Sequence, residues 1–128
     1  MKKRGAIVRE IKFRAWDNTS KKMIYDSSFS SSHKIMTWHG TVYNNGKVQD
    51  YVMLQYTGLR DKNNVEIYEG DIWKRETFIA RVGFGFSGWA LWCMAESSGC
   101  YQYPSFYSNA VTGEVIGNIY ENPELIKS

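Results

Sequence analysis

The stretch TGLRDKNNVEIYEGDIW at residues 57–73 decides the fold that the sequence predicts, because it contains two tight turns. The run DKNN at residues 61–64 forms the first turn, since aspartate caps nearby backbone N–H groups and asparagine tolerates a positive φ. Gly70 and Asp71 form the second turn and lead into a new strand that begins at Ile72. The stretch therefore predicts short strands joined by tight turns.

The sequence after residue 60 predicts five short strands in close succession. Aromatic residues make up 16% of the chain, and aromatic and β-branched side chains pack well on a pleated sheet but lose rotamer freedom in a helix. We therefore expect an all-β fold in which residues 61–128 form a small five-stranded barrel. Asn122 as N-cap and Pro123 at the first helical position predict one short helical turn at the end. The expected strands cover residues 72–75, 78–84, 89–94, 100–103 and 115–120.

Residues 1–60 are expected to form an N-terminal β subdomain built from hairpins. The run REIKFRAW alternates and predicts a half-buried strand, DNTSKK predicts a turn, and MIY predicts the returning strand. Asn45 and Gly46 give the strongest two-residue turn signal and predict a second hairpin. In the first strand, one face is expected to hold Ile11, Phe13 and Ala15, and the opposite face Lys12, Arg14 and Trp16.

Charge is divided unevenly along the chain. The first 34 residues contain nine basic and three acidic residues, a net charge of +6, whereas the remainder contains seven basic and ten acidic residues, a net charge of −3. Such an asymmetry suits two subdomains, or contact between the basic part of one copy and the acidic part of another. It favours a homo-oligomer in which the N-terminal subdomain takes part in self-association.

The sequence predicts neither export nor membrane insertion. After MKKRG only three apolar residues precede Arg9, which is too short a run for a signal peptide, and no stretch approaches the roughly 20 apolar residues of a membrane span. We therefore expect a cytoplasmic protein. Cys93 and Cys100 would face one another across a hairpin, but free thiols are the expected state in a reducing compartment.

The glycine-rich stretch VGFGFSGWALWC places Gly83, Gly85 and Gly88 in a G-x-G-x-x-G pattern, the fingerprint of dinucleotide-binding proteins. That fingerprint requires a helix at its last glycine and a parallel crossover, but WALWCM alternates like a strand and soon meets a turn. A kinase-type glycine loop would need a lysine and acidic partners that the sequence lacks. The glycines instead indicate a bend between two barrel strands, and no nucleotide cofactor is expected.

No complete catalytic or metal-binding set is present in the sequence. His33 and His39 are its only histidines, and no cysteine or carboxylate is spaced to complete a four-ligand set with them. Glu69 and Asp71 could act as an acid and base pair, although turn capping is the more ordinary role. We therefore expect no enzyme, no cofactor and no metal site, with an enzyme that uses these carboxylates as a minor alternative.

Basic and aromatic residues near the N-terminus make nucleic-acid binding the alternative function. Lysine and arginine contact phosphates, and aromatic rings stack bases at about 1–3 kcal/mol each. Against this, outward basic side chains also protect edge strands from aggregation, and most aromatic residues are needed for the core. The candidate contact residues are Arg9, Lys12, Arg14 and Trp16.

Three segments of the sequence resemble the YopX family, small proteins of phages and prophages in Firmicutes and other bacteria. They are REIKFRAWDNTSKKMIY, VMLQYTGLRDKNNVEIYEGDIW and VIGNIYENPEL, in the family's order. Asn63-Asn64 departs from the family's usual Asn-Gly, and the turn tolerates it because asparagine also accepts the left-handed conformation. The resemblance implies a self-associating N-terminal β part and a C-terminal barrel similar to Src-homology 3 domains. It implies no activity and supplies no catalytic residues.

These observations together predict a phage- or prophage-encoded accessory protein. We expect a non-enzymatic interaction module that associates with itself and presents its barrel to a host or phage protein. Nucleic-acid binding through the basic first strand is the alternative.

Overall fold

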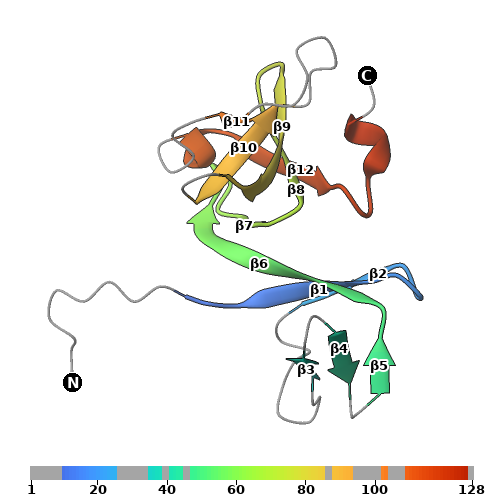
Figure 1. Ribbon diagram of the computed structural model, residues 1–128. Helices are drawn as coiled ribbons and strands as arrows, with labels where there is room; N and C mark the ends of the chain where they lie inside the picture. The colour runs from blue at the N-terminus through green and yellow to red at the C-terminus, as the bar shows by residue number, and fades with distance from the viewer. Residues whose placement is uncertain are drawn as a thin grey trace, which may run out of the picture.

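The structure, a computed structural model, describes residues 10–25, 35–38, 41–44, 47–85, 88–93, 102–103 and 109–126. It confirms the predicted all-β class, with three antiparallel sheets. Figure 1 shows the five-stranded sheet at one end of the molecule, with β1 and the long strand β6 below it. The strands are β1 (Phe13–Asp17), β2 (Lys22–Ile24), β3 (Ile35–Trp38), β4 (Thr41–Asn44), β5 (Lys47–Gln49), β6 (Tyr51–Arg60), β7 (Glu66–Tyr68), β8 (Asp71–Arg75), β9 (Phe78–Phe84), β10 (Trp89–Cys93), β11 (Gln102–Tyr103) and β12 (Glu114–Asn118).

The first sheet has the strand order β2-β1-β6-β7. Its β1–β2 hairpin closes where the sequence predicts, because a carboxylate oxygen of Asp17 accepts hydrogen bonds from the N–H groups of Thr19 and Ser20. On its other side β1 pairs along its whole length with β6. The first strand is therefore a central strand of its sheet, and its basic residues do not protect an edge.

The second sheet has the strand order β11-β10-β9-β8-β12 and contains all five strands predicted after residue 60. β9 has the predicted bounds, while β8 begins one residue early at Asp71, β10 ends one residue early at Cys93, and β12 covers 114–118. Of the fourth predicted strand, residues 102–103 are described. The strand pairs found among the described residues do not join β11 to β12, so closure into a barrel of the Src-homology 3 type stays a prediction.

β9 and β10 form an antiparallel hairpin across the glycine-rich stretch, as predicted. Phe84 pairs with Trp89, and the N–H of Gly85 donates to the carbonyl of Gly88 at 2.5 Å. Gly88 has a φ of 141°, a region that side chains rarely adopt. A strand rather than a helix follows Gly88, so the stretch lacks the helix that a dinucleotide fingerprint requires.

The hydrophobic core lies between β7 and the five-stranded sheet. Trp73 is fully buried, and its indole N–H donates to the carbonyl of Ala110 at 2.9 Å. Ala110 begins the short 3-10 helix η3 (Ala110–Thr112), which is followed by Gly113. A Cβ at Gly113 would lie 2.4 Å from the Trp73 ring, so only glycine fits there. The buried core residues are Ile67, Trp73, Ala80, Val82, Leu91 and Ala110.

The remaining elements also follow the sequence. A third sheet consists of β3, β4 and β5. Asn44 of β4 pairs with Lys47 of β5, which confirms the hairpin predicted at Asn45-Gly46. These two residues themselves lie outside the described ones. The short 3-10 helix η4 (Pro123–Ile126) confirms the predicted C-terminal turn. In the described ranges, no helix has the length and apolar character needed to cross a membrane.

β6 connects the two parts of the chain that the sequence divides at residue 60. Residues 51–55 of β6 pair with β1, and Tyr56 and Arg60 pair with β7, with a bulge between these two residues. Gly58 lies in that bulge with a φ of 91°. Because β7 lies beyond residue 60 but belongs to the first sheet, the two parts share that sheet, and their division into subdomains stays a prediction.

Candidate functional site

A pocket of about 330 Å³ opens where the first sheet meets β8, β12 and the C-terminal turn. Pockets of this size in which several polar groups converge are the usual form of a binding site. We call it the junction pocket and take it as the candidate functional site of the described residues. The lining side chains that bear on function are Arg14, Tyr25, Glu66, Tyr68, Asp71 and Glu121.

A buried ion pair between Arg14 on β1 and Asp71 at the start of β8 lines the junction pocket. Arg14 Nη2 lies 2.7 Å from Asp71 Oδ1, and the two side chains are 4% and 2% exposed. The same nitrogen donates to the carbonyl of Glu69 at 3.2 Å, and Asp71 Oδ2 accepts from the N–H of Tyr68 at 2.7 Å. This pair ties the first sheet to the five-stranded sheet.

The guanidinium of Arg14 retains unused donors. Both side-chain hydrogen bonds of Arg14 come from Nη2, and Nε is buried without a partner. The group lies over the ring of Tyr68, 4.7 Å from its centroid, which is a favourable cation–π contact. Because a buried, unpaired donor costs about 1–3 kcal/mol, an acceptor that reached Arg14 would be bound favourably.

Burial raises the pKa of Asp71 to about 6, against the lowering effects of the Arg14 charge and of the hydrogen bonds from Tyr68 and Arg14. The negative charge of Asp61 adds to the increase. Asp71 is therefore mostly ionised at pH 7 but takes up a proton in mildly acidic solution. The ion pair of the junction pocket is accordingly sensitive to pH.

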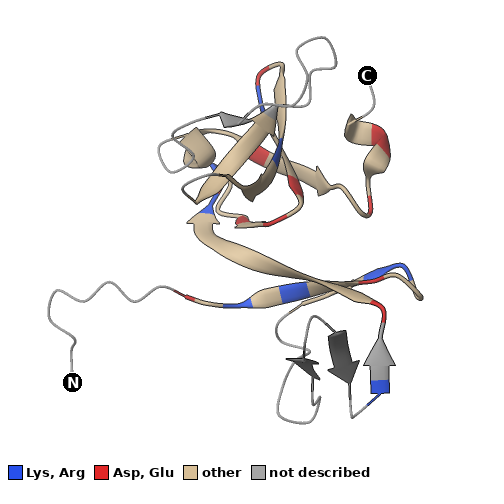
Figure 2. Ribbon diagram, in the orientation of Figure 1, with Lys and Arg blue, Asp and Glu red and all other residues tan. Residues whose placement is uncertain are grey.

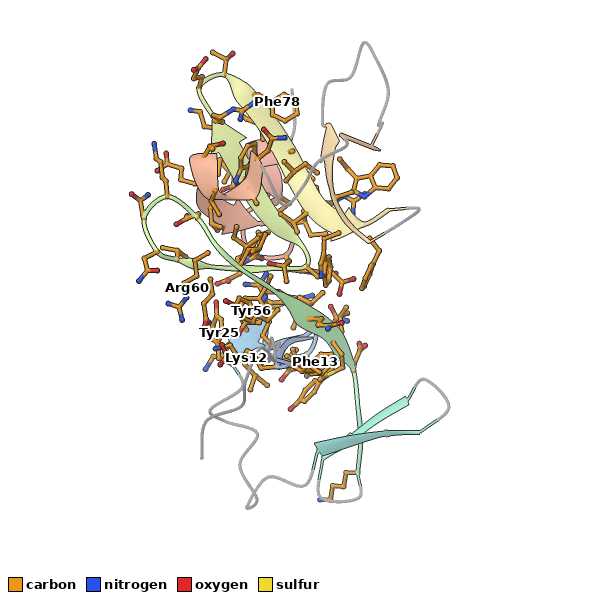
Figure 3. All side chains as sticks on the ribbon, turned by 90° about the vertical axis from the view of Figure 1, so that its left-hand side faces the viewer. Lys12, Phe13, Tyr25, Tyr56, Arg60 and Phe78 are labelled. Carbon is orange, nitrogen blue, oxygen red and sulfur yellow. The ribbon has the colours of Figure 1, made fainter. Side chains whose placement is uncertain are left out.

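Tyr25 and Glu66 also line the junction pocket. Tyr25 is 46% exposed and meets the ring of Tyr68 edge-on, with 6.1 Å between the centroids. Glu66 forms ion pairs with Lys12 and, at 3.5 Å, with Arg60, and its hydrogen bond raises the pKa of Lys12 above the ordinary value. Figure 3 shows Lys12, Tyr25 and Arg60 close together at the level where the two sheets meet.

The turn after β12 supplies the last wall of the junction pocket. The side-chain oxygen of Asn118 accepts from the N–H groups of Tyr120 and Glu121, and its amide donates to Glu121 Oε1 at 2.8 Å. Gly117 leaves room for Asn122, since a Cβ there would lie 2.5 Å from Asn122 Oδ1. These contacts hold the exposed carboxylate of Glu121 at the rim.

Two of the four residues predicted to contact nucleic acid form ion pairs with acidic residues of the chain. Lys12 pairs with Glu66, and Arg14 pairs with Asp71. Trp16 is 6% exposed and stacks on Tyr120, with 5.7 Å between the ring centroids. Arg9 lies outside the described residues. Nucleic-acid binding by these residues stays a prediction, but Lys12, Arg14 and the indole ring of Trp16 already have partners within the chain.

The predicted division of faces in β1 is wrong. Arg14 and Trp16, assigned to the polar face, are buried, whereas Ile11 and Phe13, assigned to the apolar face, are 64% and 37% exposed. Ala15 is fully buried as expected. The physical reason is that Asp71 of the other sheet neutralises the Arg14 charge, which allows the polar face of β1 to be covered.

Glu69 and Asp71 hold the structure together at the second predicted turn. Glu69 Oε1 accepts from the N–H of Gln55 at 3.3 Å, and both oxygens of Asp71 are hydrogen-bonded. Among the residues that the structure describes, no three His, Cys, Asp or Glu side chains come together in a way that could hold a metal ion. His33, His39 and Cys100 lie outside the described residues.

Sequence reasoning missed the pairing of Arg14 with Asp71 and the roles of Tyr25, Tyr68 and Glu121. One signal was available, because Trp16 shares the face of Arg14 in REIKFRAW. A tryptophan on a face assigned to solvent indicates that the face is buried. That signal would have identified Arg14 as a buried charge in need of an acidic partner, but not which acid supplies it.

Comparison with known proteins gives a family match and a similar solved structure. The family model described as YopX protein matches residues 12–127. The chain is also similar to the crystal structure of protein EF1440 from Enterococcus faecalis, with 28% sequence identity and a TM-score of 0.61 over 94% of this chain and 100% of that one. No curated protein matches the chain. The family match includes every residue of the junction pocket.

Proposed function

The chain belongs to the YopX family, and on that premise we propose that it is a phage- or prophage-encoded accessory protein that acts as a non-enzymatic interaction module. In this proposal it associates with itself and binds a host or phage protein. The observation that carries the proposal is the junction pocket, which combines exposed aromatic surface, free carboxylate oxygen and a guanidinium with unused donors. A protein segment offers complementary groups for all three.

Exposed apolar side chains support a protein rather than a small-molecule partner. Ile11 is 64% exposed, Phe84 55% and Val65 46%, and Val65 lines the junction pocket. Phe84 stacks on Trp89 with 4.0 Å between the ring centroids. Aromatic residues such as Phe84 and Trp89 are enriched at protein interfaces.

The bonding of the acidic residues supports a non-enzymatic role. A general acid or base needs a carboxylate that can exchange its proton with a substrate. Asp71 uses both oxygens within the fold, and Glu69 accepts a backbone hydrogen bond. These bonds give both carboxylates a structural role: Asp71 caps the turn through the N–H of Tyr68, whereas Glu69 bonds to β6 instead.

Sedimentation velocity over a wide range of protein concentrations tests the proposal. We expect the wild-type chain to associate and Tyr25→Ala to weaken association about tenfold, because aromatic anchors contribute about 1–2 kcal/mol or more at interfaces. Val111→Ala is the matched control, since Val111 is also 46% exposed but lies outside the junction pocket. A strictly monomeric wild type would refute self-association.

A further inference from the structure

We infer that the junction pocket binds the basic N-terminal segment of a second copy of the chain, residues 1–9. A lysine or arginine of that segment lies between Tyr25 and the carboxylate of Glu121, and a backbone carbonyl of the segment accepts from Arg14. The inference rests on the proposed self-association and names the two surfaces that meet.

The charge of the junction pocket favours a cationic occupant. Its lining contains one basic residue, Arg14, and three acidic ones, Glu66, Asp71 and Glu121. Asp71 is neutralised by Arg14, and Glu66 by Lys12. Glu121 is exposed, and its carboxylate accepts a hydrogen bond from the neutral amide of Asn118. A positive group at the rim therefore gains a counter-charge, whereas a phosphate would be repelled.

The unpaired donor of Arg14 excludes ligands that offer no hydrogen-bond acceptor. A metal ion or a simple amine would leave its buried donor unpaired, because neither presents an acceptor. An anion would satisfy Arg14 but would meet the carboxylate of Glu121. A basic peptide supplies both kinds of group, since its backbone carbonyls accept hydrogen bonds and its side chains carry the positive charge.

Tyr25 adds an aromatic surface for the cation. Its ring is 46% exposed at the mouth of the junction pocket, and a cation near an exposed aromatic face gains about 0.5–1 kcal/mol. The chain uses the same contact internally, since Lys12 lies 5.0 Å from the centroid of Tyr56 and Arg14 lies 4.7 Å from that of Tyr68.

The N-terminal segment has the matching chemistry. Residues 1–9 read MKKRGAIVR and contain four basic and no acidic residues. Just after this segment, Lys12 and Arg14 form ion pairs with Glu66 and Asp71. Basic residues near the start of the chain therefore already pair with acidic residues of its second half. Figure 2 shows basic residues on and beside β1 and acidic ones on the C-terminal turn, with both signs present in both parts of the ribbon.

A second copy is the source of the segment that the proposed self-association requires, and the start of the same chain also lies beside the pocket, since Lys12 pairs with Glu66. The described chain begins at residue 10, just before β1, and Figure 1 shows that end of β1 on the opposite side of the molecule from the C-terminal turn that follows β12. Glu121 lies in that turn. The segment of a neighbouring molecule can approach this rim directly.

A charge exchange in the full-length chain tests the inference. One variant carries Lys2→Glu, Lys3→Glu and Arg4→Glu, and the other carries Glu121→Lys. Each alone is expected to weaken self-association at least tenfold in sedimentation velocity, because its segment and its pocket then carry like charges. An equimolar mixture of the two is expected to associate again, because each segment then meets a pocket of opposite charge.

Glu124→Lys is the matched control, because Glu124 is an exposed acid in η4 that does not line the junction pocket. It should associate like the wild type, and circular dichroism should show the same melting temperature for all variants. If the wild type associates but Glu121→Lys changes nothing, or if the mixture does not recover, the inference is wrong and self-association stands. If the wild type is a monomer, the proposed function fails as well.

Discussion

Two turns of the chain each bury an aspartate, but they use it in different ways. At the first turn, Asp61 Oδ1 accepts from the N–H groups of Asn63 and Val65, and Oδ2 accepts from the N–H of Val115. At the second turn, Asp71 accepts from one N–H group and from the side chain of Arg14, which lies 57 residues away in the sequence. The first aspartate is satisfied by backbone alone, whereas the second depends on one particular side chain in another sheet.

The difference shows why both turns follow from the sequence but the side-chain partner of Asp71 does not. Backbone N–H groups are present at nearly every residue, so Asp61 finds donors wherever the chain turns tightly. The partner of Asp71 is a charge, and a charge can be buried only where an opposite one meets it. The contrast can be tested by removing each aspartate in turn.

The largest effect is expected for Asp71→Leu, which should lower the free energy of unfolding by about 3–5 kcal/mol because Arg14 and the N–H of Tyr68 are left buried without the acceptor oxygens that even a protonated Asp71 provides. Urea denaturation at pH 7 measures the change. Adding Arg14→Met to Asp71→Leu should recover most of the loss, since no unpaired charge then remains. A loss below about 1 kcal/mol in the single variant would show that the pair is not buried as described.

The second effect concerns pH. The pKa of Asp71 is raised from 3.8 to about 6 in the folded chain, so the folded state binds more protons than the unfolded state between these values. This contribution to stability is fully present below pH 3.8 and is lost as the pH rises through 6, by about 3 kcal/mol at most. Urea denaturation between pH 4 and pH 7 measures this change. The free energy of unfolding should fall less with rising pH in Asp71→Asn than in the wild type. Identical profiles would contradict the raised pKa.

Asp61→Asn should have a smaller effect, a loss of about 2 kcal/mol, because the amide keeps one acceptor but leaves the N–H of Val115 without one. Denaturation of the single variant and of its combination with Asp71→Leu measures the change. The two carboxylates share no hydrogen-bond partner, so the two effects should add apart from the repulsion between the two negative charges. Strong non-additivity would mean that the two turns form one network.

The smallest effect is expected at Asn64, which holds the left-handed conformation of the first turn with a φ of 67°. Asn64→Val should cost about 1–2 kcal/mol, because a β-branched side chain is strained at positive φ. Asn64→Gly should stay within about 0.5 kcal/mol of the wild type, because glycine adopts this conformation freely. Thermal denaturation of both variants distinguishes backbone strain from a loss of side-chain contacts.

Local signals predicted most of the fold. The DKNN turn, the glycine-rich hairpin and the C-terminal turn at Pro123 each depend on a few adjacent residues, and each is confirmed. Of the two asparagines expected to tolerate positive φ, Asn64 alone adopts it. The placement of β12 beside β8 depends on contacts between distant segments, and no local pattern in the sequence indicated it.

The candidate site was predicted less well than the fold. Lys12 and Arg14 were identified as residues that matter, but for contact with an external anion. The structure instead gives them Glu66 and Asp71 as partners. Alternation in a strand identifies two faces, but it does not say whether a second sheet covers the polar one, and that information lies in the distant acids.

The pairing of β6 with strands on either side of it implies an order of folding. β1 leaves the ribosome first, yet its neighbour β6 begins at Tyr51, and Arg14 meets its counter-charge only when Asp71 has been made. Contacts between distant segments form slowly because their loops must close first. β1 can therefore form its local hairpin with β2 early, but Arg14 lacks its counter-charge until the segment that contains Asp71 has been made.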